Sequence, residues 1–445
     1  MPGPINAVKS GTIHNYMVAF LRSCVVLILT WEARAVLARH KPKIIAVTGS
    51  VGKTTTKDAI FAALSGTHHI RKSAKSFNSE IGVPLTILGL ETGWNDPLKW
   101  FINILQGFGA IFSKNYPAWL VLEVGADRPG DIRKIARWIR PDISVITGVP
   151  DIPVHVEYFN SPGEVLKEKR ELADHLKPGG TLILNGDEPR MRMLQNSFRG
   201  KSITYGFDEK NSYAAYDDAI LYENEKPVGM HFKVKRMGSS LQMAVYGALG
   251  RPRVYAALGA LAVAETIGAD TVRASQGIAQ WDPPPGRVRI IPGVKSTIII
   301  DDTYNSSPAA VLAALDTLAM VKGKRKIAVL GDMLELGRYS SEAHKTVGER
   351  VAETATMLRT VGFRARAIAQ SALDAGMKDG KILQYEMNEA ERAGRELEKE
   401  LKAGDVVLVK GSQSMRMERT VLEIMAEPLR AEELLVRMDA DWKER

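Results

Sequence analysis

The segment TGSVGKTTTK, at residues 48–57, has the residue types and spacing of a phosphate-binding turn. The β-branched run at residues 44–47 predicts a buried parallel strand immediately before it. Gly49 and Gly52 then predict a tight turn, and a helix is expected to begin at Lys53. Backbone N–H groups of such a turn, and of the first helical turn, can point at phosphate oxygens. We therefore interpret the segment as a phosphate cradle rather than as a glycine-rich turn without a ligand.

Two side chains of this cradle carry groups suited to phosphates and to their metal ion. The Lys53 ammonium can reach terminal phosphates, and the Thr54 hydroxyl can ligate Mg²⁺. The spacing is not that of the standard eight-residue loop, because Val47 stands where that pattern has its first glycine. The expected phosphate-binding residues are Gly49, Ser50, Gly52, Lys53, Thr54 and Thr55.

An acidic residue, Glu123, ends an otherwise apolar strand expected at residues 118–124. Ligands of doubly wound sheets bind at the carboxyl ends of strands, so this carboxylate is well placed to hold Mg²⁺ directly or through water. A structural carboxylate satisfied by hydrogen bonds is the alternative.

His155 lies in a loop that follows the strand expected at residues 143–147. A loop histidine is by itself more often structural than a ligand, but the segment after it is well defined. Ser161 as N-cap, Pro162 at the first helical position and Glu164 three residues after the cap form a capping box. The start of the next helix is therefore fixed.

That helix carries Lys169 on its apolar stripe. Val165, Leu172 and Leu176 recur at helical spacing, and Lys169 lies four residues after Val165 and three before Leu172. Burial would lower the pKa of this amine, and a neutral amine can add CO₂ to give a carbamate, an anion able to ligate Mg²⁺. A lysine that extends its ammonium to solvent is the alternative. Lys167 lies off the stripe and is expected in solvent.

Three expected strand ends in the second half of the chain carry polar clusters. Arg287 follows a run of prolines, and residues 301–305 end a strand with acids, hydroxyls and an amide. The segments GDMLELG, at residues 331–337, and VKGSQSMRME, at residues 409–418, repeat the pattern. Each could be a plain turn with a helix cap, but three in one unit indicate a nucleotide-binding or substrate-binding edge.

Strands and helices alternate from residue 43 onward, which predicts an α/β fold with a parallel, doubly wound sheet. A more polar region at residues 201–246 predicts a small β excursion, and an Ala-rich helix is expected at residues 254–267. Apart from those already given, the first half is expected to contain a strand at residues 181–185.

The segment WDPPPGR, at residues 281–287, cannot continue a helix or a central strand, so a semi-rigid hinge is expected there. Beyond it we expect strands at residues 296–301, 326–330, 357–361 and 405–409, and helices at residues 308–320, 341–354, 388–402 and 415–426. The predicted organisation is an N-terminal helix over residues 1–40, a P-loop-type doubly wound domain over residues 41–284 and a Rossmann-like α/β domain over residues 285–445.

The composition suits a globular protein that handles anionic substrates. Lys and Arg outnumber Asp and Glu by 60 to 51 in 445 residues, which gives a net charge of +9. Nucleic acid is the competing interpretation of this charge; we do not expect it, because the basic residues are scattered and lack a nucleic-acid-binding signature. The single cysteine, Cys24, excludes an internal disulfide framework and fits a reducing cytoplasm.

Residues 16–31 form an apolar stretch interrupted by Arg22, shorter than the roughly twenty residues that span a bilayer. No small-residue cleavage site follows it, so a secretory signal is not expected. A helix that packs on the next domain or self-associates is favoured over one at the inner membrane surface, and a spanning helix is least expected. Anionic lipid would meet the basic residues at its end, which are Arg34, Arg39, Lys41 and Lys43. The expected location is the cytoplasm or that inner surface, and the expected state is a monomer.

As a set, the motifs resemble those of the Mur ligase family, ATP-dependent amide-forming ligases of peptidoglycan synthesis. They run in family order from about residue 43 to residue 425, and GDMLELG with KGSQSMRME resembles the dipeptide-adding branch. The matching segments are TGSVGKTTTK, FNSEIGVPLTIL, LEVGADRPGDI, HVEYF, KEKRE, LILNGDE, PPGR, IIDDTYNSSP, VLGDMLELG and VKGSQSMRME.

The resemblance implies ATP and Mg²⁺ as cofactors and assigns a role to each residue singled out above. The catalytic residues would be Lys53, His155 and Lys169. The magnesium ligands would be Thr54, Glu123, His155 and carbamylated Lys169. Nucleotide contacts beyond the hinge would come from Arg287, Asp302, Tyr304 and Asn305. The substrate would meet Asn78, Lys410 and Ser412.

The implied chemistry is attack of a substrate carboxylate on the γ-phosphate of ATP to give an acyl phosphate, from which an amine then displaces phosphate. The branch implies UDP-muramoyl-tripeptide and D-alanyl-D-alanine as substrates, and no nucleic-acid partner. A ligase with another acceptor, such as a polyamino acid or a folate-type γ-glutamyl chain, is the first alternative. A non-catalytic ATP-binding scaffold is the second.

Two departures from the family pattern bear on these expectations. Only about forty residues precede the cradle strand, where members of this branch carry a domain for the UDP-sugar. The family tends to have Gly-x-His-Asn beside the adenine, whereas this chain has Gly250-Arg251-Pro252-Arg253, and a later family asparagine is Ala256. The sugar and adenine contacts are therefore expected to differ.

Overall fold

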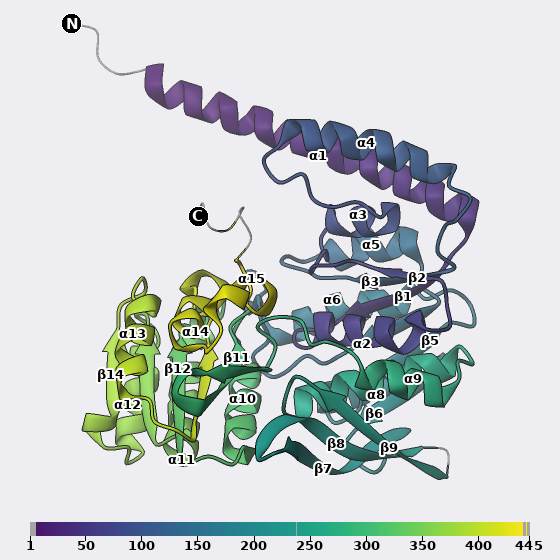
Figure 1. Ribbon diagram of the computed structural model, residues 1–445. Helices are drawn as coiled ribbons and strands as arrows, with labels where there is room; N and C mark the ends of the chain where they lie inside the picture. The colour runs from purple at the N-terminus through teal and green to yellow at the C-terminus, as the bar shows by residue number, and fades with distance from the viewer. Residues whose placement is uncertain (1–5, 237, 439–441, 443–445) are drawn as a thin grey trace, which may run out of the picture.

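The computed structural model describes residues 6–236, 238–438 and 442, and for residues 6–20 it describes the backbone alone. Two α/β units lie side by side, with the first half of the chain around one sheet and the second half around the other (Figure 1). The predicted α/β fold class, a doubly wound first unit followed by a second α/β unit, is confirmed.

The first sheet has the strand order β2-β3-β1-β4-β5-β6-β7-β8-β9. Strands β2 to β6 pair in parallel, and β1 lies between β3 and β4, with Val47 opposite both Glu123 and Val145. The carboxyl ends of β1, β3 and β4 therefore meet at one edge. The strands are β1 Lys43–Thr48, β2 Ile70–Lys72, β3 Trp119–Glu123, β4 Ile143–Ile146, β5 Thr181–Asn185, β6 Lys201–Gly206, β7 Tyr213–Glu223, β8 Lys226–Arg236 and β9 Ser239–Tyr246.

The region at residues 201–246 is larger than the small excursion that the sequence predicts. Strand β6 pairs in parallel with β5, β7 pairs in parallel with β6, and β8 and β9 add an antiparallel meander to the same sheet. Its alternating pattern is what one would expect of strands with one exposed face, since β8 buries every second residue over much of its length. The predicted β structure is therefore confirmed, but it is not small, because four strands extend the first sheet.

Helices cover both faces of the first sheet. On one face α2 packs against α8 and α9, and on the other α3 and α5 lie beneath the layer of α1 and α4 (Figure 1). Buried apolar residues of β1 alternate between the two faces, with Ile45 and Val47 in one core and Ile44 and Ala46 in the other. The helices are α1 Asn6–His40, α2 Lys53–Ser65, α3 Gly82–Leu88, α4 Pro97–Ile111, α5 Asp131–Ile139, α6 Pro162–Asp174, α7 Pro189–Ser197, α8 Arg251–Thr266 and α9 Thr271–Ala279.

Helix α1 is longer than the apolar stretch at residues 16–31, and it packs along α4 and α3. Leu29, Ala33 and Val36 are fully buried in this contact. In the part of the chain that the structure describes, no helix is long and apolar enough to cross a membrane.

The second sheet has the order β10-β11-β15-β12-β13-β14, with β10 antiparallel to β11 and the remaining pairs parallel. The strands are β10 Arg289–Gly293, β11 Thr297–Asp302, β12 Arg325–Gly331, β13 Met357–Val361, β14 Ile382–Tyr385 and β15 Asp405–Lys410. The helices are α10 Pro308–Met320, α11 Ser340–Thr354, α12 Arg366–Asp374, α13 Ala390–Glu400, α14 Glu418–Ile424 and α15 Ala431–Leu434.

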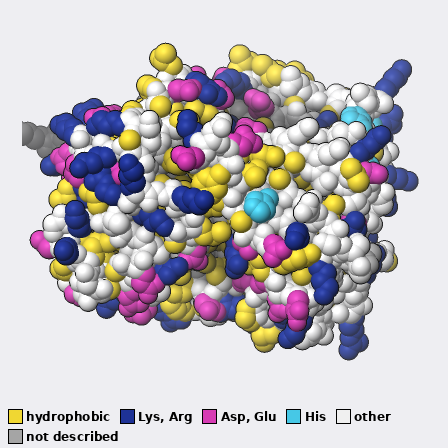
Figure 2. All heavy atoms as spheres, turned by 60° about the horizontal axis from the view of Figure 1, so that its bottom comes forward, with side chains coloured by type: hydrophobic (Ala, Val, Ile, Leu, Met, Phe, Trp, Pro, Cys, Tyr) yellow, Lys and Arg dark blue, Asp and Glu magenta, His cyan; other side chains and the backbone are white. Residues whose placement is uncertain are grey.

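The segment between the sheets, at residues 281–288, is irregular, and Gly286 near its end is held to the second unit by hydrogen bonds. Gly286 N–H donates to Asp301 Oδ2 at 3.0 Å, and Gly286 O accepts from Tyr304 N–H at 3.2 Å. A hydrophobic core that includes residues of α8 continues into α10 of the second unit. Figure 2 shows the bottom face of Figure 1, where basic and acidic side chains are interspersed, unlike the continuous basic stripe of a nucleic-acid-binding surface.

Candidate active site

A cavity of about 810 Å³ lies between the two units at the carboxyl ends of their strands. Most of the residues predicted to bind nucleotide, metal or substrate line it. They are Ser50, Gly52, Lys53, Thr54, Thr55, Asn78, Glu123, His155, Arg287, Asp302, Tyr304, Asn305 and Lys410. Three further predicted residues, Gly49, Lys169 and Ser412, lie outside its lining.

The turn after β1 has the backbone conformation of a close-fitting cradle. Gly49 has φ +147°, and a Cβ added there would lie 2.0 Å from the Thr147 hydroxyl oxygen. Gly52 has φ +79° and is the N-cap of α2, a left-handed conformation that favours glycine. Ser50 N–H donates to Gly148 O at 2.8 Å, which ties the turn to the end of β4. The glycines predicted from the sequence are therefore required by the geometry of the turn.

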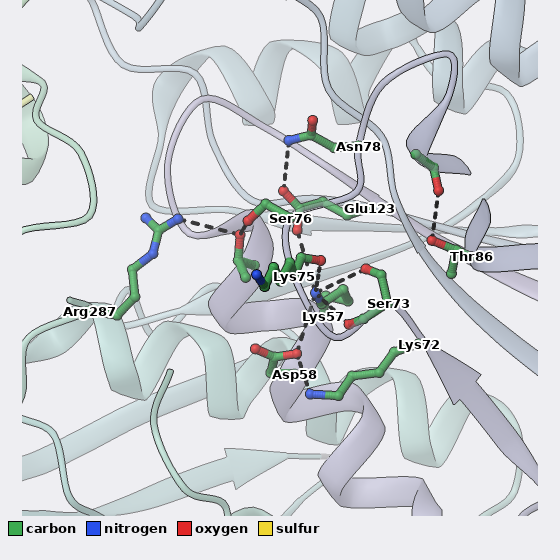
Figure 3. A network of polar contacts seen from close by, with 12 residues as sticks. Lys57, Asp58, Lys72, Ser73, Lys75, Ser76, Asn78, Thr86, Glu123 and Arg287 are labelled. Carbon is green, nitrogen blue, oxygen red and sulfur yellow. Dashed lines mark hydrogen bonds and ion pairs between the residues drawn. The ribbon is translucent and has the colours of Figure 1, made fainter. Parts of the chain in front are cut away.

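Lys53 lies folded back on the turn, with its Nζ donating to Gly49 O at 2.9 Å. Burial lowers the pKa of this amine; the charge of Arg287 also lowers it, whereas that of Glu123 raises it. The Thr54 hydroxyl lies 2.8 Å from Ser76 Oγ and accepts from Arg287 Nη2 at 3.4 Å. Arg287 thus reaches from the second unit to the first turn of α2, as Figure 3 shows.

Glu123 is 1% exposed at the end of β3 and lines the cavity. Its Oε1 accepts from Asn78 Nδ2 at 3.0 Å, and its Oε2 has no hydrogen-bond partner among the described residues. Lys57 Nζ lies 3.8 Å from that oxygen and donates to Ser73 O and Lys75 O, both at 3.1 Å (Figure 3). Lys57 therefore compensates part of the charge of Glu123, and the oxygen without a hydrogen-bond donor could still accept a cation.

Lys57 is a residue of this site that sequence reasoning missed. It is fully buried on α2, one helical turn after Lys53, so the TTTK end of the motif was a signal that could have found it. Its Nζ also lies 3.5 Å from Asp58 Oδ1. The lysine therefore supplies positive charge behind Glu123.

Lys169 points inward on α6, as its place on the apolar stripe predicts. The residue is 3% exposed, and Val165 and Leu172 beside it are buried. Burial lowers the pKa of its amine to about 7, with Lys53 adding repulsion of like charge. Lys167 is exposed, also as predicted. The extended, solvated alternative for Lys169 is therefore wrong.

The start of α6 differs in one detail from a capping box. Ser161 Oγ accepts from Glu164 N–H at 3.4 Å, as expected of an N-cap. Glu164, however, accepts from Asn160 N–H at 3.1 Å and from Asn160 Nδ2, rather than from Ser161 N–H. The extended backbone of Ser161 leaves the preceding residue closer to this carboxylate. The helix start itself, at Pro162, is as predicted.

Glu168, next to Lys169, joins this helix to the loop after β3. Its two carboxylate oxygens accept from Gly130 N–H at 2.7 Å and Ile132 N–H at 2.6 Å, at the start of α5. The position of Lys169 is thereby fixed relative to the loop that contains Asp127, another residue of the cavity lining.

His155 has φ +65° and lies just before the short helix Val156–Tyr158. Its Nδ1 lies 2.6 Å from Glu335 Oε2, and its Nε2 lies 3.8 Å from Asp127 Oδ1. Interaction with His155 lowers the pKa of the Glu335 carboxyl. Glu335 belongs to the GDMLELG segment of the second unit, and no short-range pattern could have indicated this partner.

Arg287 and Asp302 form the part of the site that faces the cradle from the second unit. The Arg287 guanidinium lies 3.9 Å from the centre of the Tyr304 ring. Asp302 is paired with Lys410 Nζ at 2.6 Å, and Lys410 also donates to Asn305 O at 2.8 Å. Burial raises the pKa of Asp302, whereas Lys410 lowers it. In this conformation Lys410 holds the end of β11 rather than presenting its ammonium to a substrate.

Ser412, also predicted for the substrate, is buried. Its Oγ accepts from Leu334 N–H at 2.9 Å, and its N–H donates to Asp332 O at 3.0 Å. Ser412 therefore joins the two polar segments that follow β12 and β15. The sequence predicts that both segments lie at the same edge of the second sheet. Its contact with a substrate stays a prediction.

The region where the sequence departs from the family pattern forms another wall of the cavity. Arg253 is buried, with its guanidinium 3.1 Å from the centre of the Trp281 ring and Nη2 donating to Trp281 O at 2.8 Å. Arg251 instead pairs with Asp218 at 3.2 Å. Pro252, Arg253 and Ala256 all line the cavity.

The residues of the cavity could bind a divalent cation, provided that the substrate supplies most of its ligands. In the described residues, no cluster of three or more His, Cys, Asp and Glu side chains is arranged to hold a metal ion. Thr54 and Glu123 both line the cavity, Glu123 Oε2 has no hydrogen-bond donor among the described residues, and hard oxygen donors are those that Mg²⁺ prefers. An ion bound here would therefore take further ligands from phosphate oxygens.

Family models match both units. One described as Mur ligase middle domain matches residues 102–264, and one described as Mur ligase, glutamate ligase domain matches residues 286–413. The UDP-N-acetylmuramoyl-tripeptide--D-alanyl-D-alanine ligase of Bacillus subtilis is 30% identical over 399 residues, which are 89% of this chain and 79% of the relative. The protein of the same name from Escherichia coli is 27% identical over 397 residues, 88% of this chain and 78% of the relative.

Solved structures show the same fold. MurF ligase from Thermotoga maritima in complex with ADP superposes with a TM-score of 0.73 at 25% identity, covering 89% of this chain and 82% of that one. MurF from Acinetobacter baumannii gives a TM-score of 0.74 at 23% identity, covering 89% and 79%. The relatives, the family models and the phosphate cradle agree, and the chain belongs to the Mur ligase family of ATP-dependent ligases.

Proposed function

We propose that this ligase adds D-alanyl-D-alanine to a UDP-muramoyl-tripeptide in peptidoglycan synthesis. The observation that carries the proposal is the composition of the cavity, in which the phosphate cradle and Glu123 of the first unit face Arg287 and Asp302 of the second. The names of the relatives from Bacillus subtilis and Escherichia coli support the choice of substrates. The segments after β12 and β15, on which the resemblance to the dipeptide-adding branch rests, lie at the same edge.

The residues of the cradle would act on the phosphates of ATP. Lys53 would leave Gly49 O, with which it pairs here, and bind the terminal phosphates, while backbone N–H groups of the turn bind their oxygens. Arg287, which already contacts Thr54 across the cavity, would neutralise charge that develops as the γ-phosphate is transferred. The substrate carboxylate attacks this phosphorus, ADP leaves, and the resulting acyl phosphate is attacked by the amine of the second substrate with release of phosphate.

Mg²⁺ would be held by Thr54, Glu123 and His155 of the cavity lining, together with phosphate oxygens. Lys169 lies outside that lining, and its carbamate, which lengthens the side chain, would be the further protein ligand. Bound there, the ion supplies charge neutralisation of the phosphates. His155 would have to exchange its contact with Glu335 for this role, since its Nδ1 lies 2.6 Å from that carboxylate. Asn78 orients Glu123 through their hydrogen bond and lies beside the path that a substrate carboxylate would take.

The proposal is tested by phosphate release from ATP and Mg²⁺ in the presence of UDP-muramoyl-tripeptide, with and without D-alanyl-D-alanine. Release that requires both substrates is the expected result, and a Lys53→Ala variant should abolish it. Phosphate release that instead requires a γ-glutamyl acceptor would assign the chain to the other acceptor class. Nucleotide binding without release in any combination would identify a scaffold and contradict the proposal.

A further inference from the structure

Helices α1 and α4 carry an exposed apolar surface on the outer side of the first unit, and we propose that it docks the protein on an anionic lipid surface. We call it the α1/α4 face and define it by the exposed apolar side chains Leu21, Leu27, Ile28, Trp31, Leu98, Phe101, Ile102, Leu105, Phe108 and Phe112. Figure 1 shows the two helices lying alongside each other at the periphery of the molecule. This inference does not depend on which acceptor the ligase uses.

Helix α4 is amphipathic, but its apolar face points outward to solvent and its opposite face is the one that the protein covers. Its residues Leu98, Phe101, Leu105, Phe108 and Phe112 follow the three-and-four spacing of one helix face, and each is between 52% and 65% exposed. The opposite face, with Asn103, Gly107 and Ile111, is buried against the protein. A helix of a soluble core would place its aromatic residues on the inner side, so the outward row needs a partner.

The size of the face exceeds what an isolated soluble surface usually carries. Ten large apolar side chains, each roughly half exposed, present on the order of 1,000 Å², against roughly 300–600 Å² for the largest patch of a typical monomer. The two helices are in contact at the C-terminal end of α1, where the Arg39 guanidinium lies 5.5 Å from the centre of the Phe112 ring. His40 Nε2 is also within hydrogen-bond distance of Ile111 O, at 3.1 Å.

The charges around the face favour lipid over other occupants. The exposed ionisable side chains of α4 and of α1 from residue 21 onward, with the turn after α4, are all basic: Arg22, Arg34, Arg39, Lys99 and Lys114. Of the nearby acids, Glu32 is buried, Asp96 accepts the N–H groups of Leu98 and Lys99 as the N-cap of α4, and Glu91 before α4 is exposed, so basic side chains remain in excess around the face. Apolar and aromatic side chains rimmed by Lys and Arg match a bilayer interface with anionic headgroups.

A second copy of the chain is a poorer match to this surface. A two-fold interface brings the same patch of both subunits together, so it would place the basic rims of the two faces against each other. Like charges in contact across an interface are costly. A lipid surface satisfies both the apolar row and the cations, since long basic side chains can extend their charged ends to the headgroups.

The test is flotation of the full chain with vesicles of phosphatidylcholine alone and of phosphatidylcholine mixed with phosphatidylglycerol. We expect the protein to float with the mixed vesicles, and high salt to weaken this binding. The double variant Phe101→Ser/Phe108→Ser should lose it, and Arg22→Glu/Lys99→Glu should reduce partitioning by roughly tenfold or more. The matched control is Phe363→Ser/Leu429→Ser, which alters two side chains that are 73% and 99% exposed on the second unit.

Phosphate release measured without vesicles monitors the fold of each variant, and none of these positions lines the cavity. Equal flotation with both vesicle types, or none with either, would overturn the proposal. Equal loss in the control variant would do so too. If light scattering shows a dimer that Phe101→Ser/Phe108→Ser dissociates, and vesicles do not capture the protein, the occupant is a second copy. A negative result in the flotation experiments would not change the result of the phosphate-release assay, so the two proposals are tested separately.

Discussion

Replacing Lys169 tests whether the buried amine works as a carbamate. A lysine with its ordinary pKa of 10.5 is neutral in about one molecule in three thousand at pH 7, whereas one with a pKa of about 7 is neutral in about half. Since CO₂ adds to the neutral amine alone, burial of Lys169 raises the reactive fraction about a thousandfold. Because formation of the carbamate also releases a proton, its occupancy should fall by about tenfold or more for each pH unit below 7, where the neutral amine itself falls about tenfold.

The assay compares Lys169→Ala with Lys167→Ala, whose parent side chain is exposed on the same helix. We expect Lys169→Ala to lower ligation by about a hundredfold or more and short carboxylic acids to restore part of it, because they can place an oxygen ligand in the vacated space. Lys167→Ala should stay active. With ¹³C-labelled bicarbonate, the wild-type protein should show a carbamate carbon signal that Lys169→Ala lacks.

Three outcomes would refute this reasoning. Equal loss of activity in both variants would show that the helix rather than the amine matters. A labelled carbon signal that persists in Lys169→Ala would place the carbamate elsewhere. A neutral fraction of the Lys169 amine that still rises about tenfold per pH unit well above pH 7 would contradict its lowered pKa.

The remaining predictions concern stability and can be checked by denaturant unfolding. Gly49→Ala should cost about 2 kcal/mol or more and impair nucleotide binding, since its Cβ would lie 2.0 Å from Thr147 Oγ1; unchanged unfolding would contradict the tight turn. Lys410→Met should cost about 3 kcal/mol because it leaves the buried Asp302 carboxylate without its ion-pair partner, and a neutral effect would show that the pair is solvated. Burial raises the pKa of Glu32 from 4.5 to about 7, so the native state binds its proton more tightly and loses stability as the pH rises between these values. Glu32→Gln should therefore stabilise the protein by about 1–3 kcal/mol above pH 7 and have little effect below pH 4.5.

Short-range patterns predicted the parts of the site whose positions follow from local geometry. The cradle could be predicted because glycine is required where φ is positive, and Gly52 has φ +79°. The inward position of Lys169 followed from the period of α6, which places it between Val165 and Leu172. The register of a parallel sheet then brings Glu123 to the edge where β1 ends.

Other features depend on contacts between distant segments, and no local pattern specifies them. Glu335 meets His155, and Lys410 meets Asp302, because the two units pack together at the strand ends. The exposed row of α4 also escaped prediction, since an amphipathic pattern gives the spacing of a face but not the side of the helix that the protein covers. The predicted substrate role of Lys410 was drawn from a motif, whereas its observed ion pair is a tertiary contact.

The buried lysines of the site interact electrostatically, so a change of charge on one of them affects the pKa of another. Lys53 repels Lys169, which adds to the effect of burial in lowering the pKa of the Lys169 amine and so favours the neutral, reactive form. Conversion to a carbamate would replace a positive charge near Lys53 by a negative one. Lys57 lies behind Glu123, where three oxygens of Ser73 and Lys75 hold its Nζ. In the proposed function, phosphates would offset the charge of the lysines and a divalent ion would offset the charge of the carboxylates, so the two would bind together.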